Sequence, residues 1–216
     1  MLNNLSFTDQ VYKFLNTFIY RLNIIYEKIV GLDISSTLFP SDFGFDDNYI
    51  FRSSSSDSLF LDICLRYLSV SNKDSFLDIG CGKGKVLHQA SKYNFSQIDG
   101  IEIVHQISKI ARINFDKIKQ SRTKIFDIDA ITFSKYSQYN FIYMYNPFPS
   151  EIMLRVIYKI AKSLKQNNRE ITLIYNNPTC HVTIHTTNIF RKIFDFAGSH
   201  DNRIFVYTNR KNHSHK

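Results

Sequence analysis

Apolar residues in the first thirty positions recur at helical spacing. The apolar positions there are separated alternately by four and three residues: Val11, Leu15, Phe18, Leu22, Ile25 and Ile29. Such spacing puts them on one face, so it predicts an amphipathic helix over residues 6–29. A second helical pattern covers 58–68, after the serine-rich run 52–58 that provides a cap. Residues 31–48 combine clusters of Gly, Pro, Ser and Asp, which are typical of a loop.

From residue 75 onward, predicted strands alternate with predicted helices. The expected strands cover 75–79, 97–103, 124–128, 139–145 and 170–175, and the expected helices cover 85–93, 104–119 and 151–165. Largely apolar strands in this alternation indicate a doubly wound α/β fold, with a mostly parallel sheet covered on both faces.

The end of the chain has a different pattern. Residues 189–196 and 203–208 are two β-rich runs separated by a segment with the composition of a turn. They predict an antiparallel hairpin that closes the sheet. The preceding segment 179–188 is crowded with β-branched residues, so we expect it to make a poor helix.

Composition places the chain among ordinary globular proteins. Of its 216 residues, 44% are hydrophobic and 21% charged, which excludes a disordered or collagen-like chain. Three scattered cysteines, Cys64, Cys81 and Cys180, match neither a disulfide framework nor a zinc site. We expect reduced thiols in a cytoplasmic protein, because the start lacks the pattern of a signal peptide. No apolar stretch is long enough to predict a membrane span.

The net charge of +8 is unevenly distributed along the chain. The first 50 residues hold three basic and six acidic side chains, so the positive excess belongs to the remainder. Such a balance leaves nucleic acid open as a partner, since positive surfaces attract phosphates. Lysine-rich solvated helix faces are the simpler interpretation, and we prefer it.

The sharpest motif is a glycine-rich turn after the first predicted strand. The strand ends at Asp78, and Gly80, Gly82 and Gly84 follow at every second position before a helix begins. Glycines permit a tight turn and close backbone approach to a ligand, and a helix start offers unpaired N–H groups. Dinucleotide sites use G-x-G-x-x-G, and phosphate-binding loops use G-x-x-x-x-G-K-[ST]. The spacing here fits neither, and the carboxylate of Asp78 would repel a pyrophosphate, so we expect a ligand with a positively charged amino group.

This segment resembles the first motif, D-x-G-x-G-x-G, of class I methyltransferases, the seven-strand family that depends on S-adenosylmethionine. The resemblance covers residues 58 to the end and implies a seven-stranded Rossmann-like sheet. It divides the chain into an N-terminal helical extension and loop, 1–57, and a methyltransferase domain, 58–216. The segments GLDISS, YMYNPF and IYNNP are more closely similar to a largely uncharacterised bacterial group in that family. By resemblance, Asp78 holds the methionine amino group, and the three glycines let the backbone wrap the cofactor.

Two further acidic positions fit the same cofactor. Glu102 ends the second predicted strand, where a carboxylate accepts hydrogen bonds from both ribose hydroxyls of a nucleoside. The resemblance also places an acid there. After the third strand, it implies that an acidic residue followed by a small one meets the adenine amino group. Asp129 and Ala130 fit this role better than Asp127, although a plain acid-rich turn stays open as an interpretation.

The fourth predicted strand ends in Tyr145, Asn146, Pro147 and Phe148. Ligands of open parallel sheets bind beyond the carboxyl ends of the strands, so we expect this segment beside the glycine-rich turn. The Asn146 amide carbonyl and a backbone carbonyl of the segment around Pro147 would accept both N–H bonds of an amino group and orient it for attack. Tyr145 and Phe148 would stack on a planar acceptor or face the cationic sulfonium.

The Tyr145–Phe148 segment departs from the N-P-P-Y motif of amino-group methyltransferases that it resembles. One proline is missing, and the aromatic residue comes one place early. A proline-rich strand exit packed by core aromatics is the alternative. A second exit of this kind follows the fifth strand at 175–178 and is either a pocket wall or a turn. His181 and His185 come next, and we interpret them as surface residues and expect no metal site.

Together these features predict an S-adenosylmethionine-dependent methyltransferase. Apart from Lys83 and Lys85, the motifs contain no His or Lys to act as a base. We therefore expect N-methylation of an amino or amide group, with an amide, an exocyclic base nitrogen or another weakly basic amine favoured. Protein, RNA or another nucleic acid, and small molecules all remain open as acceptors. The alternatives are a non-catalytic module that binds S-adenosylmethionine and a nucleotide-dependent oxidoreductase. We also expect the N-terminal helix to pack over the cofactor site and shape the acceptor site.

Overall fold

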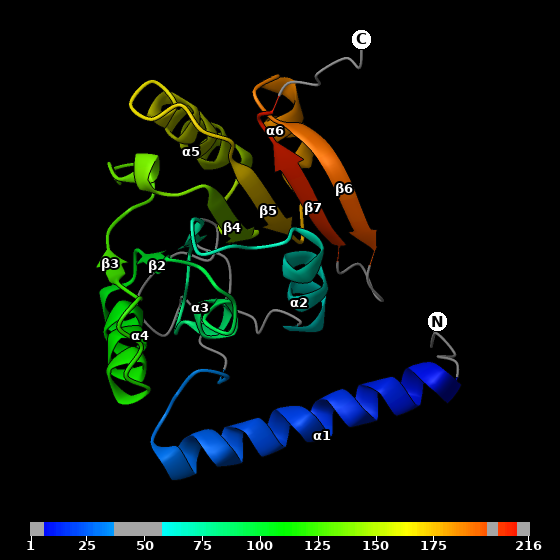
Figure 1. Ribbon diagram of the computed structural model, residues 1–216. Helices are drawn as coiled ribbons and strands as arrows, with labels where there is room; N and C mark the ends of the chain where they lie inside the picture. The colour runs from blue at the N-terminus through cyan, green and yellow to red at the C-terminus, as the bar shows by residue number, and fades with distance from the viewer. Residues whose placement is uncertain (1–6, 37–57, 198–202, 211–216) are drawn as a thin grey trace.

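A computed structural model describes residues 7–36, 58–197 and 203–210. Its seven-stranded sheet has the order β3-β2-β1-β4-β5-β7-β6 (Figure 1). The strands are β1 (Ser75–Ile79), β2 (Gln97–Glu102), β3 (Ile125–Asp127), β4 (Phe141–Tyr145), β5 (Thr172–Asn176), β6 (Arg191–Ala197) and β7 (Arg203–Thr208). Strands β1 to β5 pair with one another in parallel, and β7 runs antiparallel to both β5 and β6. The predicted fold class and closing hairpin are confirmed.

Helices connect the strands largely where the sequence predicts them. They are α1 (Phe7–Val30), α2 (Ser58–Tyr67), α3 (Lys85–Ala90), α4 (His105–Lys117), α5 (Ser150–Ser163) and α6 (His181–Thr186), with a 3-10 turn at Tyr136–Gln138. The predicted cap at 52–57, most of the predicted loop 31–48 and the hairpin turn lie outside the described residues.

Helix α6 corrects one prediction, since its β-branched sequence indicated a poor helix. Six residues nevertheless form a helix just after Pro178. Ile184 is fully buried in the cluster that also holds the inner face of α5. Tertiary burial therefore outweighs the small cost in helix propensity at this position.

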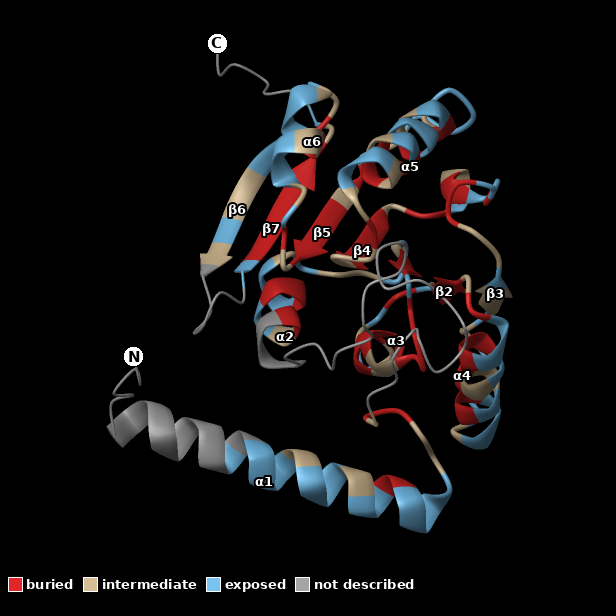
Figure 2. Ribbon diagram, turned by 180° about the vertical axis from the view of Figure 1, so that it is seen from behind, coloured by how far each residue is buried: buried red, intermediate tan, exposed pale blue. Residues whose placement is uncertain are grey.

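The sheet separates two apolar clusters, and neighbouring residues of a strand point into different ones. Leu77 of β1 packs on the side of α5 and α6, whereas Phe76 packs on the side of α2 and α3. This period of two, together with burial of nearly every position in β1, β2, β4 and β5, is what a sheet covered on both faces requires. Figure 2 shows the buried strands between the two sets of helices.

Helix α1 lies apart from this core along most of its length, as both ribbon views show. Most of its described large apolar side chains are exposed, from 41% at Val30 to 78% at Ile29, whereas Tyr20 and Ile24 are partly buried. The prediction that α1 packs over the cofactor site is therefore wrong. The segment after the helix contacts the domain through Gly31, Asp33 and Ser36. Within the described ranges, no helix is long and apolar enough to cross a membrane.

Candidate functional site

The exits of β1 and β4 meet at one edge of the sheet. These strands are paired in parallel, with Ile79 opposite Met144, so the residues that follow emerge side by side. A Cβ placed on Gly80 would lie 3.1 Å from the Cβ of Pro147. The glycine-rich turn and the Asn146–Pro147 segment are thus in van der Waals contact, as their positions in the sequence predict.

The turn itself depends on glycine. Gly80 has a φ of 78° and Gly84 a φ of 91°, in the left-handed region that side chains disfavour. The N–H groups of Gly80 and Cys81 both donate to the carbonyl of Ile101, at 2.9 and 3.0 Å. This pair of hydrogen bonds fixes the turn against the end of β2, immediately before Glu102.

Gly84 also allows close packing, because a Cβ at this position would clash with the ring of Phe115. We expect Gly84→Ala to lower the free energy of unfolding by about 2–4 kcal/mol, from left-handed strain plus overpacking. Gly31→Ala is the matched control, since Gly31 has a φ of 72° but faces the flexible end of Lys117. It should cost only about 1–2 kcal/mol for the strained backbone. Chemical denaturation measures both; equal losses would contradict the packing argument.

Asp78 is a buried carboxyl group near the end of β1, close enough to Glu102 for the two charges to interact. Its residue is 2% exposed. Burial, reinforced by the nearby charge of Glu102, raises the pKa of Asp78 well above its ordinary value. Such a group gains stability from a cationic partner, because it then no longer bears an uncompensated charge in a low-dielectric setting. The position therefore fits an ammonium group, which is the character predicted for the ligand.

Glu102 lies next to Asp78 but is already hydrogen-bonded. Its Oε2 accepts the N–H of Gly82 at 2.9 Å and its Oε1 accepts the N–H of Val104 at 3.0 Å. Burial raises its pKa, while these backbone donors act in the opposite direction. Each carboxylate oxygen can accept more than one hydrogen bond, so the residue retains capacity for the hydroxyls of a ribose.

The segment after β3 is organised mainly as a turn. Asp129 Oδ1 accepts the N–H of Ile131 at 2.8 Å, and the Ala130 carbonyl accepts the Tyr136 hydroxyl at 2.8 Å. Asp127 instead pairs with His105. Of the two acids, Asp129 is the one that lies within this ordered turn. Its hydrogen bond to Ile131 also gives Asp129 a structural role in forming the turn.

The side chain of Asn146 is held by Tyr175 of the second strand exit and by Thr179 just after that exit. Asn146 has a φ of 35°, and its N–H donates to the carbonyl of Asn176 at 3.1 Å. Its Oδ1 accepts the hydroxyl of Tyr175 at 3.2 Å and the hydroxyl of Thr179. Tyr175 in turn accepts the N–H of Cys180 at 3.2 Å, which directs its own proton toward Asn146.

These contacts change the expected role of the Asn146 side chain. Its carbonyl is occupied by two protein hydroxyls, so backbone carbonyls of the segment are left to accept N–H groups of an acceptor. In the sequence, the feature that indicated these contacts is the second strand exit at 175–178. The structure places this exit beside the exit of β4. Phe148 is 8% exposed and belongs to the apolar core, so its ring packs inside the protein; Tyr145 is only partly buried.

The histidines of α6 are both exposed. Among residues 7–36, 58–197 and 203–210, no three His, Cys, Asp or Glu side chains are grouped so as to hold a metal ion.

Comparison with known proteins gives one family match. Residues 56–172 match the family model described as histone methylation protein DOT1. Among curated proteins, none matches the chain.

Solved structures share the fold at low sequence identity. A mutant of MtNAS in complex with S-adenosylmethionine has a TM-score of 0.54 and 13% identity over 69% of this chain and 60% of that one. A SAM-dependent methyltransferase from Aquifex aeolicus has a TM-score of 0.56 and 12% identity, over 68% and 87%. An RNA methyltransferase from Salinibacter ruber in complex with S-adenosyl-L-homocysteine has a TM-score of 0.53 and 14% identity, over 73% and 95%. The chain therefore spans less than two thirds of the length of MtNAS.

Proposed function

We propose that this chain transfers a methyl group to a nitrogen atom. The proposal starts from its family, because the chain belongs to the DOT1 family of histone methylation proteins. The protein is a methyltransferase, and its cofactor is S-adenosylmethionine. Membership in this family sets aside the oxidoreductase and the non-catalytic binding module. The type of nitrogen and the acceptor molecule are the parts that we propose.

The observation that carries the proposal is the buried Asp78 carboxyl beside a left-handed glycine turn. Asp78 would hold the amino group of the methionine end, and the turn from Gly80 to Gly84 would follow it with its backbone. Glu102 would bind the ribose, and Asp129 with Ala130 would contact the adenine. When bound, the cofactor supplies an electrophilic methyl group on a sulfonium.

Nitrogen methylation is supported by the contact between the turn and the exit of β4. The segment from Tyr145 to Pro147 reaches the glycine turn through Gly80 and Pro147. Backbone carbonyls there would accept the N–H bonds of the acceptor and turn its lone pair toward the methyl group. Positioning of this kind supplies most of the catalysis when no strong base is required.

A protein side chain is the first acceptor class to test, because the matching family is named for histone methylation. The similarity to a bacterial group with a Y-N-P-F segment and a cytoplasmic location stay predictions, as does the division into residues 1–57 and 58–216. Among the basic residues, Arg122 donates to the carbonyls of Ser91 and Phe95, at 2.8 and 2.6 Å, so its charge serves the fold.

Transfer of a labelled methyl group from S-adenosylmethionine tests this proposal. A cell extract is incubated with the purified protein and then separated into protein, nucleic acid and small solutes. We expect label in the protein fraction, bound to nitrogen. Label in RNA would show that the acceptor is a nucleic acid and not a protein. Label on oxygen or sulfur would contradict the proposed N-methylation.

A further inference from the structure

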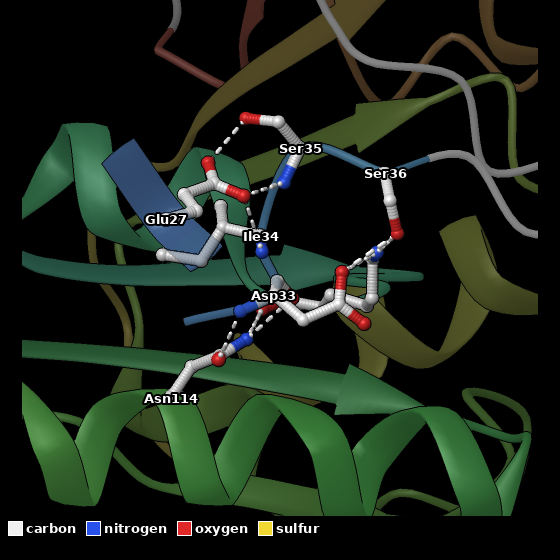
Figure 3. Close-up of polar contacts among 7 residues, drawn as sticks. Glu27, Asp33, Ile34, Ser35, Ser36 and Asn114 are labelled. Atoms are coloured by element: carbon white, nitrogen blue, oxygen red, sulfur yellow. Dashed lines mark hydrogen bonds and ion pairs between the residues drawn. The ribbon is translucent and has the colours of Figure 1, made fainter. Parts of the chain in front are cut away.

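The segment that follows α1 is organised by a carboxylate of the helix itself (Figure 3). Glu27 is 9% exposed, and its Oε2 accepts the N–H groups of Ile34 and Ser35, at 3.0 and 2.9 Å. Its Oε1 accepts the Ser35 hydroxyl at 2.5 Å. One carboxylate thus turns the chain sharply after the helix and presents residues 33–36 to the domain.

Asn114 of α4 joins this segment to the glycine-rich turn. Its Oδ1 accepts the N–H of Asp33 at 3.0 Å, and its Nδ2 donates to the carbonyl of Asp33 at 2.7 Å. The same Nδ2 group donates to the carbonyl of Lys83 at 3.1 Å. Lys83 lies between Gly82 and Gly84, so a single amide contacts both the segment and the turn.

The side chain of Lys83 makes a second connection between the same two segments. It is 3% exposed, and its ammonium group pairs with Asp33 and contacts the Ser36 hydroxyl. Ser36 also donates to Asp33 at 2.6 Å, which orders the carboxylate. The ammonium group therefore contacts a carboxylate and a hydroxyl of the segment after α1, and it would lose this ion pair if that segment moved away.

The glycine turn needs such external support, because glycine-rich backbone has the most conformational freedom to lose. On one side, the Gly82 N–H is fixed by Glu102. On the other side, Lys83 is fixed by Asn114 and Asp33. If the turn adopts its binding conformation for only a fraction of the time, the apparent affinity for the ligand is reduced by that fraction.

We infer that residues 33–36 are positioning residues of the cofactor site, because they hold Lys83 and thereby keep the glycine turn in its binding conformation. This inference rests on the proposed function, since it assigns the turn to S-adenosylmethionine. It also gives the N-terminal extension a role: α1 does not cover the site, but its last turn orders the segment that braces it.

Calorimetric titration of the full chain with S-adenosylmethionine tests the inference without knowledge of the acceptor. Asp33→Asn removes the charge facing Lys83 and leaves the backbone contacts with Asn114 in place. We expect this variant to raise the Kd about 10-fold. Ser36→Ala should raise it less, and adding Ser36→Ala to Asp33→Asn should add little, because both act on the same ammonium group.

The matched control is Asp62→Asn, which removes an ion pair with Arg66 on α2. It should leave the Kd unchanged, whatever it does to thermal stability. A wild-type Kd in a folded Asp33→Asn variant would overturn the inference, and so would an equal rise in the Asp62→Asn control. If the wild-type chain itself binds no S-adenosylmethionine, the proposed function fails instead.

Discussion

Asp78→Asn should weaken binding of S-adenosylmethionine by about 100-fold or more, because it removes the charge opposite the ligand ammonium group. Loss of one partner from a buried charge pair costs about 2–5 kcal/mol of binding free energy. The side chain stays similar in size, so the glycine turn keeps its packing. Calorimetry on both proteins measures the change; an unaltered Kd would remove Asp78 from the site.

The same substitution should stabilise the protein in the absence of ligand. The pKa of Asp78 is raised in the folded state by burial and by Glu102, so the native protein binds the proton more tightly than the unfolded chain does. Stability therefore falls as the pH rises from the ordinary carboxyl range through the raised pKa. The Asp78→Asn variant has no carboxyl group to ionise at this position and does not lose this stability. Its Tm should therefore exceed that of the wild type at neutral pH, and the difference in Tm should shrink in acid.

Cofactor affinity should depend on pH in the opposite sense. Only the ionised carboxylate pairs with an ammonium group, so the affinity of the wild type falls as the pH drops through the raised pKa of Asp78. The decline begins at a higher pH than an ordinary aspartate would give. The asparagine variant should lack this part of the dependence, and a parallel pH profile for both proteins would contradict the assignment.

Asn146→Gly should reduce the rate of methyl transfer by about 100-fold or more while leaving the Kd for the cofactor nearly unchanged. The Asn146 amide is fixed by Tyr175 and Thr179 and thereby holds in place the backbone carbonyls at the exit of β4 that would accept the N–H bonds of the acceptor. Glycine is the informative replacement, because it adopts the left-handed φ of 35° found at Asn146 without strain.

Asn146→Ala is the companion variant, since it loses the same amide and adds backbone strain of roughly 1–2 kcal/mol. Comparing the two separates the side chain from the conformation. If Asn146→Gly transfers methyl groups at the wild-type rate, asparagine is there only to end the strand in a left-handed turn. That turn-forming role would then replace the one we propose.

The sequence predicts the backbone geometry of the candidate site where local spacing sets it. Glycines at alternate positions after an acid-ended strand define the turn, and the parallel strand order brings the Asn146 segment beside it. The bracing contacts could not be predicted in this way. Asp33 and Lys83 are 50 residues apart, and Tyr175 is 29 residues from Asn146, so no periodicity relates them.

Two other differences have tertiary causes. Helix α6 forms because burial of Ile184 outweighs its β-branched composition. The apolar spacing of α1 correctly predicts a helix, but amphipathic spacing does not say what the apolar face contacts, and in this structure that face is exposed. Propensity and periodicity describe one segment at a time, whereas docking depends on partners distant in sequence.

Titration of the purified 216-residue chain with S-adenosylmethionine decides whether the glycine turn is a cofactor site. We predict saturable heat with one cofactor per chain, a rise in Tm, and loss of both in Asp78→Asn. A folded protein that shows neither heat nor a thermal shift would contradict the assignment of the glycine turn as the cofactor site.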